Sequence, residues 1–489
     1  MTSPRPSPDG RILVVDVGTS SLRAGIVGGD GRVGHVHHRP LLPDSPAPGL
    51  VEFDGALMAA TVLEVARAAL AEGGPVTAVG ITNQRASTLV WDRATGEPVA
   101  PGLGWQDLRT IGTVLELIGE GIHIAPNLSA TKAHALLDAA DPDRTRDLCV
   151  GTVDSWVAWT LSEGALHVTD PTNAALMGLR TVDSTAWSDE VLARLRIPVE
   201  SLPTVVDSVG VVGPATALDG APPIAGIAGD QQASLAGQGC FAPGQAKATF
   251  GTGGMLDVCI GPERPAFPTR GPAGGFPIVT MGRDGERIWG VEAAMLSAGT
   301  NVEWLRDDLG IIADAADSHA VASACADSEG VWYVPALLGL GAPKWDYGAR
   351  GTLLGVSRGS GRAQIVRAVL EGVAHRGADL LETAEADGGL PIPALRIDGG
   401  MSDNPTFVQA LADATQRPVE VSPEREATTL GAAYLAGLAT GVWSGTDELA
   451  ALWAPQTVVQ PARTLDRERW QEAVRRAERW IPELSGLDF

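Results

Sequence analysis

A carboxylate and a glycine turn, about twenty residues apart, are the residues of this sequence best suited to catalysis. Asp230 follows a short apolar run, residues 224–228, and precedes a stretch of small residues, 231–238, that predicts a helix. An aspartate in this place lies at the carboxyl end of a strand, where open α/β sheets bind ligands. The turn at residues 251–254 reads Gly-Thr-Gly-Gly, and backbone N–H groups there can approach a phosphate because no Cβ intervenes. A base beside a phosphate-binding turn suits phosphoryl transfer; the alternative is a capped helix followed by an ordinary glycine hairpin.

A second turn with the same Gly-Thr pair occurs near the N-terminus. Residues 12–17 form an apolar run that contains Asp16, the turn at residues 18–21 reads Gly-Thr-Ser-Ser, and a second strand is predicted over residues 22–27. Both Gly-Thr turns therefore connect two strands, about 230 residues apart. Such a repetition predicts two similarly built domains that face each other.

Length and charge limit the classes of function. A chain of 489 residues is too long for one core and predicts two or three domains. Its net charge of −23 argues against binding DNA or RNA, although backbone N–H groups can still hold a small anionic ligand. No run of 18 apolar residues is present, so no membrane span is predicted.

Cysteine usage and the N-terminus indicate a cytoplasmic protein. Residues 1–10 contain no apolar segment, so a flexible leader is expected there and not a signal peptide. The four cysteines are far apart, without a Cys-x-x-Cys pair, and predict reduced, mostly buried thiols: Cys149, Cys240, Cys259 and Cys325.

The remaining periodicities predict alternating strands and helices. Strands are expected over residues 32–37, 76–81, 88–91, 331–335, 395–397 and 418–421, and helices over 58–70, 131–140, 150–161, 297–309, 364–385, 429–441 and 467–479. Arg85 follows one predicted strand and Trp105 lies shortly after the next, which favours a ligand-binding loop over simple packing. The pair Gly399-Gly400 at a strand-to-helix junction suits close backbone approach to a nucleotide.

Taken together, these stretches resemble the FGGY carbohydrate kinases. The resemblance extends over nearly the whole chain, in the family's order, through residues 16–23, 80–85, 226–232, 249–253, 339–345, 398–400 and 429–435. One Asp-x-Gly-Thr is a weak signal, whereas seven ordered blocks are strong. The resemblance implies an α/β fold of two actin-like (ribonuclease H-like) domains across a catalytic cleft, with ATP and Mg²⁺ between them. Residues 11–242 would bind the polyol or sugar, and residues 243–489 the nucleotide.

The resemblance also implies roles for individual residues. Asp230 would act as general base on the attacking hydroxyl, and Asp16 and Asp230 would lie near the metal. The expected phosphate and nucleotide contacts are Thr19, Ser20, Ser21, Arg23, Thr252, Gly299, Glu303, Gly400 and Asn404. Glu303 stands where glycerol-phosphorylating members commonly have glutamine, so this contact departs from their pattern.

The polyol pocket departs from the pattern of the glycerol-phosphorylating members. Four positions match them: Arg85, Trp105, Asp230 and Gln231. Three differ, with Ala86 in place of a glutamate, Asn127 in place of a tyrosine and Met255 in place of a phenylalanine. Two hypotheses follow: a kinase that converts glycerol to glycerol 3-phosphate, or a kinase for a larger C4–C5 polyol or ketose, such as a tetritol, pentitol or xylulose.

A third hypothesis from another class is a catalytically idle sugar sensor on the same actin-like fold. It would be expected to lack the base, yet Asp230, Asp16 and both Gly-Thr turns are present. A filament-forming or chaperone relative would lack residues 82–85 and Trp105. The expected partners are a small polyol or sugar and further copies of this chain, as a dimer or tetramer, without nucleic acid or membrane.

Overall fold

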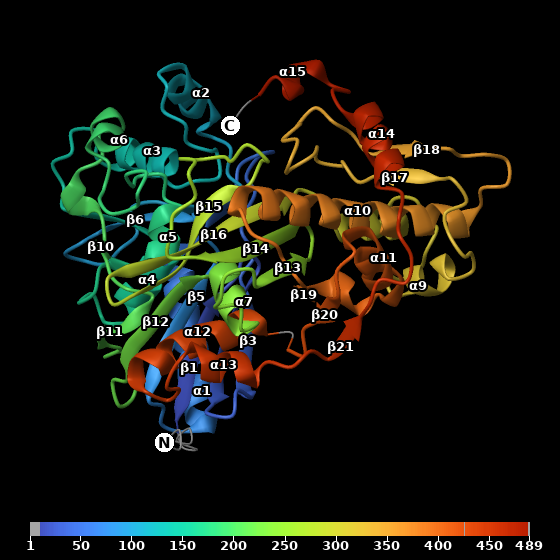
Figure 1. Ribbon diagram of the computed structural model, residues 1–489. Helices are drawn as coiled ribbons and strands as arrows, with labels where there is room; N and C mark the ends of the chain where they lie inside the picture. The colour runs from blue at the N-terminus through green and yellow to red at the C-terminus, as the bar shows by residue number, and fades with distance from the viewer. Residues whose placement is uncertain (1–9, 425, 488–489) are drawn as a thin grey trace.

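The computed structural model describes residues 10–424 and 426–487, and within them a mixed sheet of 13 strands forms the centre of the molecule (Figure 1). In spatial order the strands are β21 (Thr457–Val459), β20 (Val419–Val421), β19 (Leu395–Asp398), β13 (Ala246–Phe250), β14 (Gly254–Gly261), β16 (Glu286–Met295), β15 (Phe276–Arg283), β11 (Val209–Pro214), β12 (Pro223–Gly229), β5 (Ala78–Asn83), β1 (Arg11–Val17), β2 (Ser21–Gly28) and β3 (Val33–Pro40).

The two halves of the sheet have the same strand order. In the N-terminal half the order is β3-β2-β1-β5-β12, with antiparallel pairing from β3 to β1 and parallel pairing from β1 to β12. The C-terminal half repeats it as β16-β14-β13-β19-β20, again two antiparallel pairings and then two parallel ones. Each Gly-Thr turn joins the first two strands of its half, so the duplication predicted from these turns is present. The halves meet at a single pairing of β11 with β15, between Val209 and Arg283.

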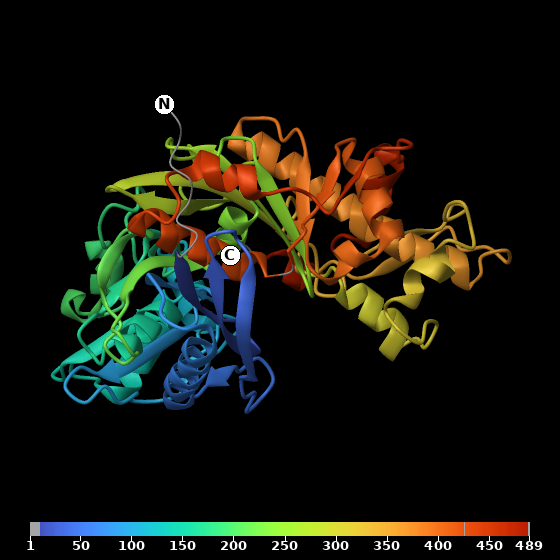
Figure 2. The same ribbon diagram turned by 90° about the horizontal axis from the view of Figure 1, so that it is seen from below.

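Helices cover both faces of the sheet, which explains why residues 12–15 of β1 are all apolar. Leu13 and Val15 pack in one cluster with residues of α1 (Gly55–Gly73), whereas Ile12 and Val14 pack in another with α12 (Ala427–Thr440). All four are fully buried. A strand buried on both faces loses the apolar–polar alternation of a surface strand. Figure 2 shows the N-terminal elements, blue to teal, at one end of the molecule, and elements coloured yellow to orange extending to the other.

The other helices and short strands complete the fold. The helices are α2 (Ile111–Gly119), α3 (Ala130–Ala140), α4 (Val153–Leu161), α5 (Pro171–Ala175), α6 (Asp189–Arg194), α7 (Asp230–Gly237), α8 (Thr300–Asp307), α9 (Asp317–Ala322), α10 (Arg362–Gly388), α11 (Pro405–Thr415), α13 (Thr446–Leu452), α14 (Arg467–Ala477) and α15 (Pro482–Ser485). The short strands are β4 (Glu52–Phe53), β6 (Thr88–Asp92), β7 (Gly102–Leu103), β8 (Leu148–Thr152), β9 (Val168–Thr169), β10 (Thr204–Val205), β17 (Trp332–Val334) and β18 (Thr352–Leu354), and 3-10 turns span Val199–Ser201 and Gly400–Asp403.

Two helices cross between the halves of the sheet. α7 follows the last strand of the N-terminal half but contacts β13, β14 and β15, whereas α12 follows the C-terminal half and contacts β12, β5 and β1. At their crossing, a Cβ on Gly431 would lie 1.7 Å from the Ala233 carbonyl oxygen, and one on Gly237 would lie 1.9 Å from that of Ala427. Only glycine fits at either position, so the two helices are in backbone contact.

Most predicted elements are present with shifted ends, and one prediction was wrong in part. Residues 150–152, expected in a helix, belong to β8, which pairs with β6; the helix begins at Val153. Pairing with a strand distant in sequence decided the conformation of Val150 over the helical pattern that follows it. Residues 276–295, for which no element was predicted, form β15 and β16.

The predictions for the termini and cysteines have separate outcomes. Residues 1–9 of the predicted leader lie outside the described residues, while Gly10 is buried against Val442. Within residues 10–424 and 426–487, no helix has the length and apolar character needed to cross a bilayer. The four cysteines are free, and three of them are buried, as predicted.

Candidate active site

Asp230 is placed by the junction of β12 and α7. It is the first residue of α7, and its Oδ1 accepts the Gln231 N–H at 2.8 Å. The preceding Gly229 pairs with Asn83 in the parallel register of β12 and β5. The residues that follow these two strands therefore leave the same edge of the sheet side by side. Burial raises the pKa of Asp230, and the nearby Arg85 guanidinium opposes that shift.

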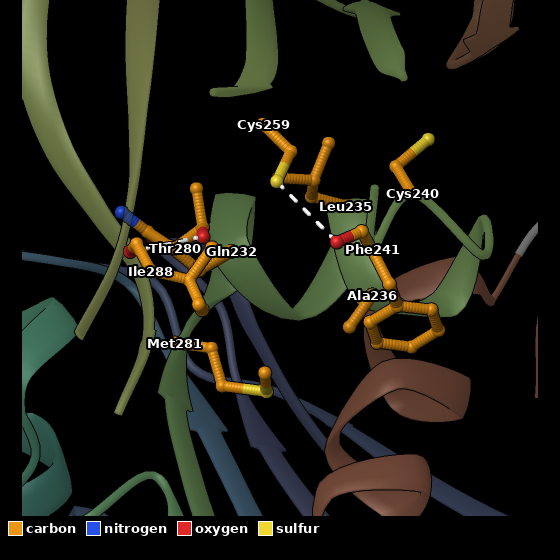
Figure 3. Close-up of a pocket in the computed structure, with 9 residues that line it drawn as sticks. All are labelled: Gln232, Leu235, Ala236, Cys240, Phe241, Cys259, Thr280, Met281 and Ile288. Carbon is orange, nitrogen blue, oxygen red and sulfur yellow. Dashed lines mark hydrogen bonds between the residues drawn. The ribbon is translucent and has the colours of Figure 1, made fainter. Parts of the chain in front are cut away.

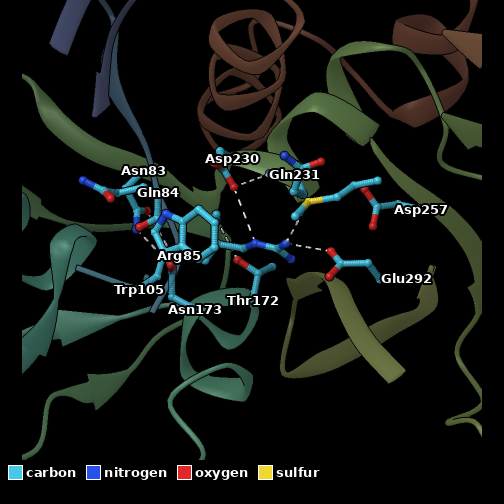
Figure 4. A network of polar contacts seen from close by, with 12 residues as sticks. Asn83, Gln84, Arg85, Trp105, Thr172, Asn173, Asp230, Gln231, Asp257 and Glu292 are labelled. Carbon is cyan, nitrogen blue, oxygen red and sulfur yellow. Dashed lines mark hydrogen bonds and ion pairs between the residues drawn. The ribbon is translucent and has the colours of Figure 1, made fainter. Parts of the chain in front are cut away.

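Arg85 lies between Asp230, from the N-terminal half of the chain, and Glu292, from the C-terminal half (Figure 4). Its Nε is 3.5 Å from Asp230 Oδ1, and its Nη2 is 2.7 Å from Oε2 of Glu292 on β16. The same Nη2 lies 3.8 Å from the Met255 sulfur. The structure thus brings the predicted pocket residues Arg85, Asp230 and Met255 together, and adds a carboxylate that was not predicted.

Trp105 connects the pocket to the first Gly-Thr turn. Its indole N–H donates to Thr19 Oγ1 at 3.2 Å, and its backbone N–H donates to Ser87 Oγ at 3.0 Å. The turn itself is closed by the Gly18 N–H, which donates to the Ser21 carbonyl at 2.9 Å, and leaves Ser20 exposed. Trp105 therefore packs beside a turn whose tip is open to a ligand.

Asp16 and Arg23 form an ion pair behind this turn. Arg23 Nε lies 3.4 Å from Asp16 Oδ2, and Arg23 also contacts Glu426, at the start of α12. Burial raises the pKa of Asp16 to about 7; Arg23 opposes the shift, and the negative charge of Asp230 adds to it. Glu426 was not predicted. It comes from the C-terminal half, so the strand that follows the first Gly-Thr turn is contacted by both halves of the chain.

The second Gly-Thr turn packs against the start of α8. The Gly299 N–H donates to the Gly251 carbonyl, and the Ala298 N–H to the Thr252 carbonyl, both at 2.8 Å. A Cβ on Gly299 would lie 2.7 Å from the Gly251 oxygen, so this contact requires glycine. The Thr252 side of the turn is exposed. Thr252 and Gly299, predicted as nucleotide contacts, are therefore neighbours.

The other predicted nucleotide contacts differ in accessibility. Gly400 is exposed, and a Cβ there would meet no atom within 4 Å. Glu303 is exposed in the first turn of α8. Asn404 is engaged within the protein: its Oδ1 accepts the Phe407 N–H at 3.1 Å, capping α11, and its Nδ2 donates to Ser318 Oγ at 2.8 Å. Gly400 and Glu303 are free to meet a ligand, whereas the Asn404 side chain has a structural role.

The substituted pocket positions differ in where their side chains lie. Ala86 is buried with φ of 61°, and its carbonyl accepts hydrogen bonds from Thr88 and Ser129 hydroxyls at 3.0 and 3.1 Å. Asn127 is exposed in the loop before α3. Because Ser129 anchors this loop to Ala86, the loop that carries Asn127 is fixed beside the Arg85 backbone.

Three buried charged residues were missed by the sequence predictions. Lys247, Asp257 and Glu292 lie within apolar strands of the C-terminal half, on β13, β14 and β16. Lys247 Nζ is 2.8 Å from Asp257 Oδ2, contacts Gln231 Oε1 and donates to Thr249 Oγ1 at 3.1 Å. A charge inside an otherwise apolar strand was the signal that could have found them, because such groups are rarely buried without a partner or function.

A small cavity behind α7 does not extend the site. Figure 3 shows it between α7 and the C-terminal strands, with Cys259 donating to the Phe241 carbonyl along its wall. Its volume of about 10 Å³ has room for a single water molecule. Neither a polyol nor a nucleotide fits there.

A duplicated sheet, a carboxylate at a strand end and a Gly-Thr turn in each half are features of a phosphotransferase of the actin-like class. The chain belongs to the FGGY family of carbohydrate kinases: its N-terminal domain model matches residues 11–237 and its C-terminal domain model residues 246–440. The predicted boundary at residues 242–243 falls between these ranges. The protein is accordingly an ATP-dependent carbohydrate kinase, and the family predicted from the sequence is confirmed.

Glycerol kinases from several organisms match nearly the full length of this chain. The glycerol kinase of Aromatoleum aromaticum is 43% identical, covering 96% of this chain and 99% of its own length, and that of Trichlorobacter lovleyi is 42% identical, with the same coverage. The crystal structure of Plasmodium falciparum glycerol kinase with ADP superposes with a TM-score of 0.89 at 26% identity, covering 98% of this chain and 99% of that one. A xylulose kinase from Lactobacillus acidophilus shares the fold, with a TM-score of 0.83 at 20% identity, covering 96% and 97% of the two chains. The predicted fold of two actin-like domains is confirmed.

Proposed function

We propose that this kinase transfers the γ-phosphoryl group of ATP to a terminal hydroxyl of glycerol, with Asp230 as the general base. The observation that carries the proposal is the position of Asp230 and Arg85 at adjoining strand ends, 3.5 Å apart. The named relatives support glycerol as the acceptor, since they are glycerol kinases over nearly their whole length.

In this proposal each pocket residue has a separate task. Arg85 and Trp105 bind and orient the polyol, so that one terminal hydroxyl points at the Asp230 carboxylate. Asp230 takes the hydroxyl proton while the oxygen forms its bond to the γ-phosphorus, and the bond from that phosphorus to the bridging oxygen of ADP breaks. A positioned base contributes roughly 10²–10⁴ in rate, and the phosphate-binding turns supply most of the remaining positioning.

Mg²⁺ would be held by Asp16 and Asp230 together with the phosphates of ATP. Carboxylate oxygens suit this cation, which usually binds one or two carboxylates and keeps several waters. Asp16 fits the role because burial and the negative charge of Asp230 raise the pKa of its carboxyl to about 7, and a cation beside the two carboxylates would favour the ionised form that binds metal. Within the part of the chain that the structure describes, no cluster of three or more such ligands forms a closed metal site. The bound cation would neutralise charge that develops on the phosphates.

A larger acceptor is the second candidate. Ala86, Asn127 and Met255 replace bulkier residues of the glycerol-phosphorylating pattern, and Asn127 is exposed on a loop fixed beside the site. These differences favour a C4–C5 polyol or ketose, whose additional carbons would extend toward that loop. An amide there can both donate and accept hydrogen bonds from hydroxyls.

A coupled assay of ADP release tests both candidates. Purified protein, ATP and Mg²⁺ are incubated with C3 to C6 polyols and ketoses, and the product is identified by phosphorus NMR. We expect phosphorylation of a terminal hydroxyl, with glycerol or a C4–C5 compound giving the highest kcat/KM. The absence of ADP release above background with every compound would refute the proposed function and favour an idle sugar sensor.

Assembly and location complete the proposal. We expect a homodimer or homotetramer in the cytoplasm, acting on a small-molecule substrate without nucleic acid or membrane. Sedimentation equilibrium at micromolar concentration measures the assembly directly, and a monomer would contradict it.

A further inference from the structure

A row of three charged side chains crosses the C-terminal half of the sheet beside Arg85 and Gln231. Lys247 on β13 is the cross-strand partner of Asp257 on β14, which in turn is the partner of Glu292 on β16. Directly opposed residues point to the same face of a sheet, so all three side chains lie on one face. Lys247 and Asp257 are fully buried, and Glu292 is 8% exposed. The proposed function assigns no task to Asp257 or Glu292.

The row joins the pocket at both ends. Glu292 reaches the Arg85 guanidinium at 2.7 Å, and Lys247 contacts the Gln231 side chain. Arg85 and the Gln231 backbone both contact Asp230, at 3.5 and 2.8 Å. These contacts surround the space in front of Asp230 with groups from both halves of the chain (Figure 4).

Burying these charges lowers the stability of the fold unless a ligand binds to them. The cluster holds three carboxylates but only two cations, Arg85 and Lys247. Two of the carboxylates, Asp257 and Glu292, lie directly opposite each other on neighbouring strands, and like charges in that position destabilise a sheet. Burial raises the pKa of Glu292, and the Asp257 charge raises it further. Buried ionic groups rarely add stability over apolar residues of similar volume. Their concentration here therefore favours a functional role.

Two observations indicate that these charged groups act on a ligand in front of Asp230. Arg85 Nη1 is buried and has no hydrogen-bond partner within residues 10–424 and 426–487, so a donor remains available for an oxygen ligand. Asp230 and Glu292 contact two different nitrogens of the same guanidinium, Nε and Nη2. A ligand whose reacting hydroxyl lies at Asp230 thus has a free donor and a second carboxylate close to its next carbons. Ala86, the residue after Arg85, has no polar side chain to serve there.

We propose that Glu292 is a substrate-binding residue, which accepts a hydrogen bond from a hydroxyl adjacent to the reacting one while holding Arg85 in place to donate to the same ligand. The inference rests on the proposed function and specifies its substrate class: a compound with a hydroxyl on the carbon next to the one that carries the phosphorylated hydroxyl. It also supplies from β16 the carboxylate that is missing at Ala86. The alternative is an ion pair that only fastens β16 to the N-terminal half.

Steady-state kinetics of E292Q and E292D separate the two explanations. With glycerol, or the best polyol of the panel, we expect E292Q to raise the polyol KM roughly ten- to hundredfold, as expected for losing a hydrogen bond to a charged group. The KM for ATP should change less than about threefold. The matched control is E286Q on the exposed start of the same strand, which should behave as wild type.

A substrate lacking the second hydroxyl distinguishes contact from structure. With 1,3-propanediol, which lacks the middle hydroxyl of glycerol, wild type and E292Q should have kcat/KM within about threefold of each other. The hydrogen bond to that hydroxyl is absent in both, and the amide oxygen of the glutamine can still accept from Arg85 and keep it in place. An ion pair with only a structural role would make E292Q equally defective on both substrates, and that result would overturn the inference.

The remaining outcomes are also decisive. Wild-type turnover together with an unchanged polyol KM in E292Q would overturn this inference and leave the proposed function standing. A wild type that phosphorylates no polyol would remove both. Circular dichroism and thermal melting monitor folding, and E292D, which keeps the charge but shortens its reach, provides a second variant if E292Q does not fold. If neither variant folds, Glu292 is a structural anchor and the inference is wrong.

Discussion

Replacing Gly431 by alanine tests the backbone contact between α7 and α12. The new Cβ would lie 1.7 Å from the Ala233 carbonyl oxygen and 2.8 Å from the Gly237 nitrogen. Ordinary van der Waals contact begins at 3.4 Å, so the helices must separate by about 1.7 Å. Both obstacles are backbone atoms, which cannot rotate away. We therefore expect a cost near the upper end of overpacking, about 3 kcal/mol.

The higher helix propensity of alanine than of glycine offsets about 1 kcal/mol of this cost, so the net destabilisation of the folded state is about 2 kcal/mol. For a chain of this length, that corresponds to a fall of about 2 °C in the thermal midpoint. The effect on activity should be larger, because α7 begins at Asp230 and a shift of about 1 Å at a reacting group can cost roughly 10²-fold.

Differential scanning fluorimetry and the ADP-release assay measure the two effects. The matched control is Gly112→Ala in α2, where a Cβ would meet nothing within 4 Å, so the thermal midpoint should stay or rise. A Gly431→Ala protein with wild-type melting and wild-type kcat would refute the close crossing of the two helices.

Three further predictions follow from single groups. Asp230→Asn should lower kcat by roughly 10²–10⁴ while polyol binding, measured by calorimetry, stays within about threefold; turnover within tenfold of wild type would contradict its role as base. Gly400→Val should raise the KM for ATP without changing the melting temperature, because Gly400 faces open space, whereas Gly399→Val should unfold the protein, since Gly399 has φ of 87° and a Cβ there would lie 2.5 Å from the Phe250 oxygen. Burial raises the pKa of Asp154 from 3.8 to about 7, so the folded state retains a proton that the unfolded state releases, and stability should fall by up to roughly 1.4 kcal/mol per pH unit between pH 5 and 7. Asp154→Asn should flatten this part of the melting profile, and an unchanged slope would show that Asp154 is ionised throughout.

Local patterns in the sequence were sufficient for the two turns and the position of Asp230. Glycines at residues 251, 253 and 254 after a strand have few structural alternatives, and an aspartate between a buried strand and a small-residue helix must lie at the sheet edge. Local patterns also indicated that Arg85 and Trp105 belong to a ligand-binding loop, and the family resemblance assigned both to the polyol pocket and named Met255. The structure brings Arg85 and Met255 to Asp230, and Trp105 to Thr19.

The contact between Glu292 and Arg85 required the tertiary structure. Glu292 lies in a stretch for which no strand was predicted, and whether its side chain faces the pocket depends on the register of β16 against β14. A shift of one residue would place it on the other face of the sheet. Nothing local to residues 286–295 fixes that register.

The sequence by itself determined the kind of chemistry, because an acid at a strand end and two phosphate-type turns are encoded within a few residues each. Only the tertiary structure decided which charges share the pocket. Lys247, Asp257 and Glu292 come from three strands of the C-terminal half, which strand pairing and the crossing of α7 and α12 bring to the N-terminal half. Glu292 contacts Arg85 there, and Lys247 contacts Gln231. Such contacts arise from long-range packing between buried surfaces, so the substrate pocket depends on the whole fold.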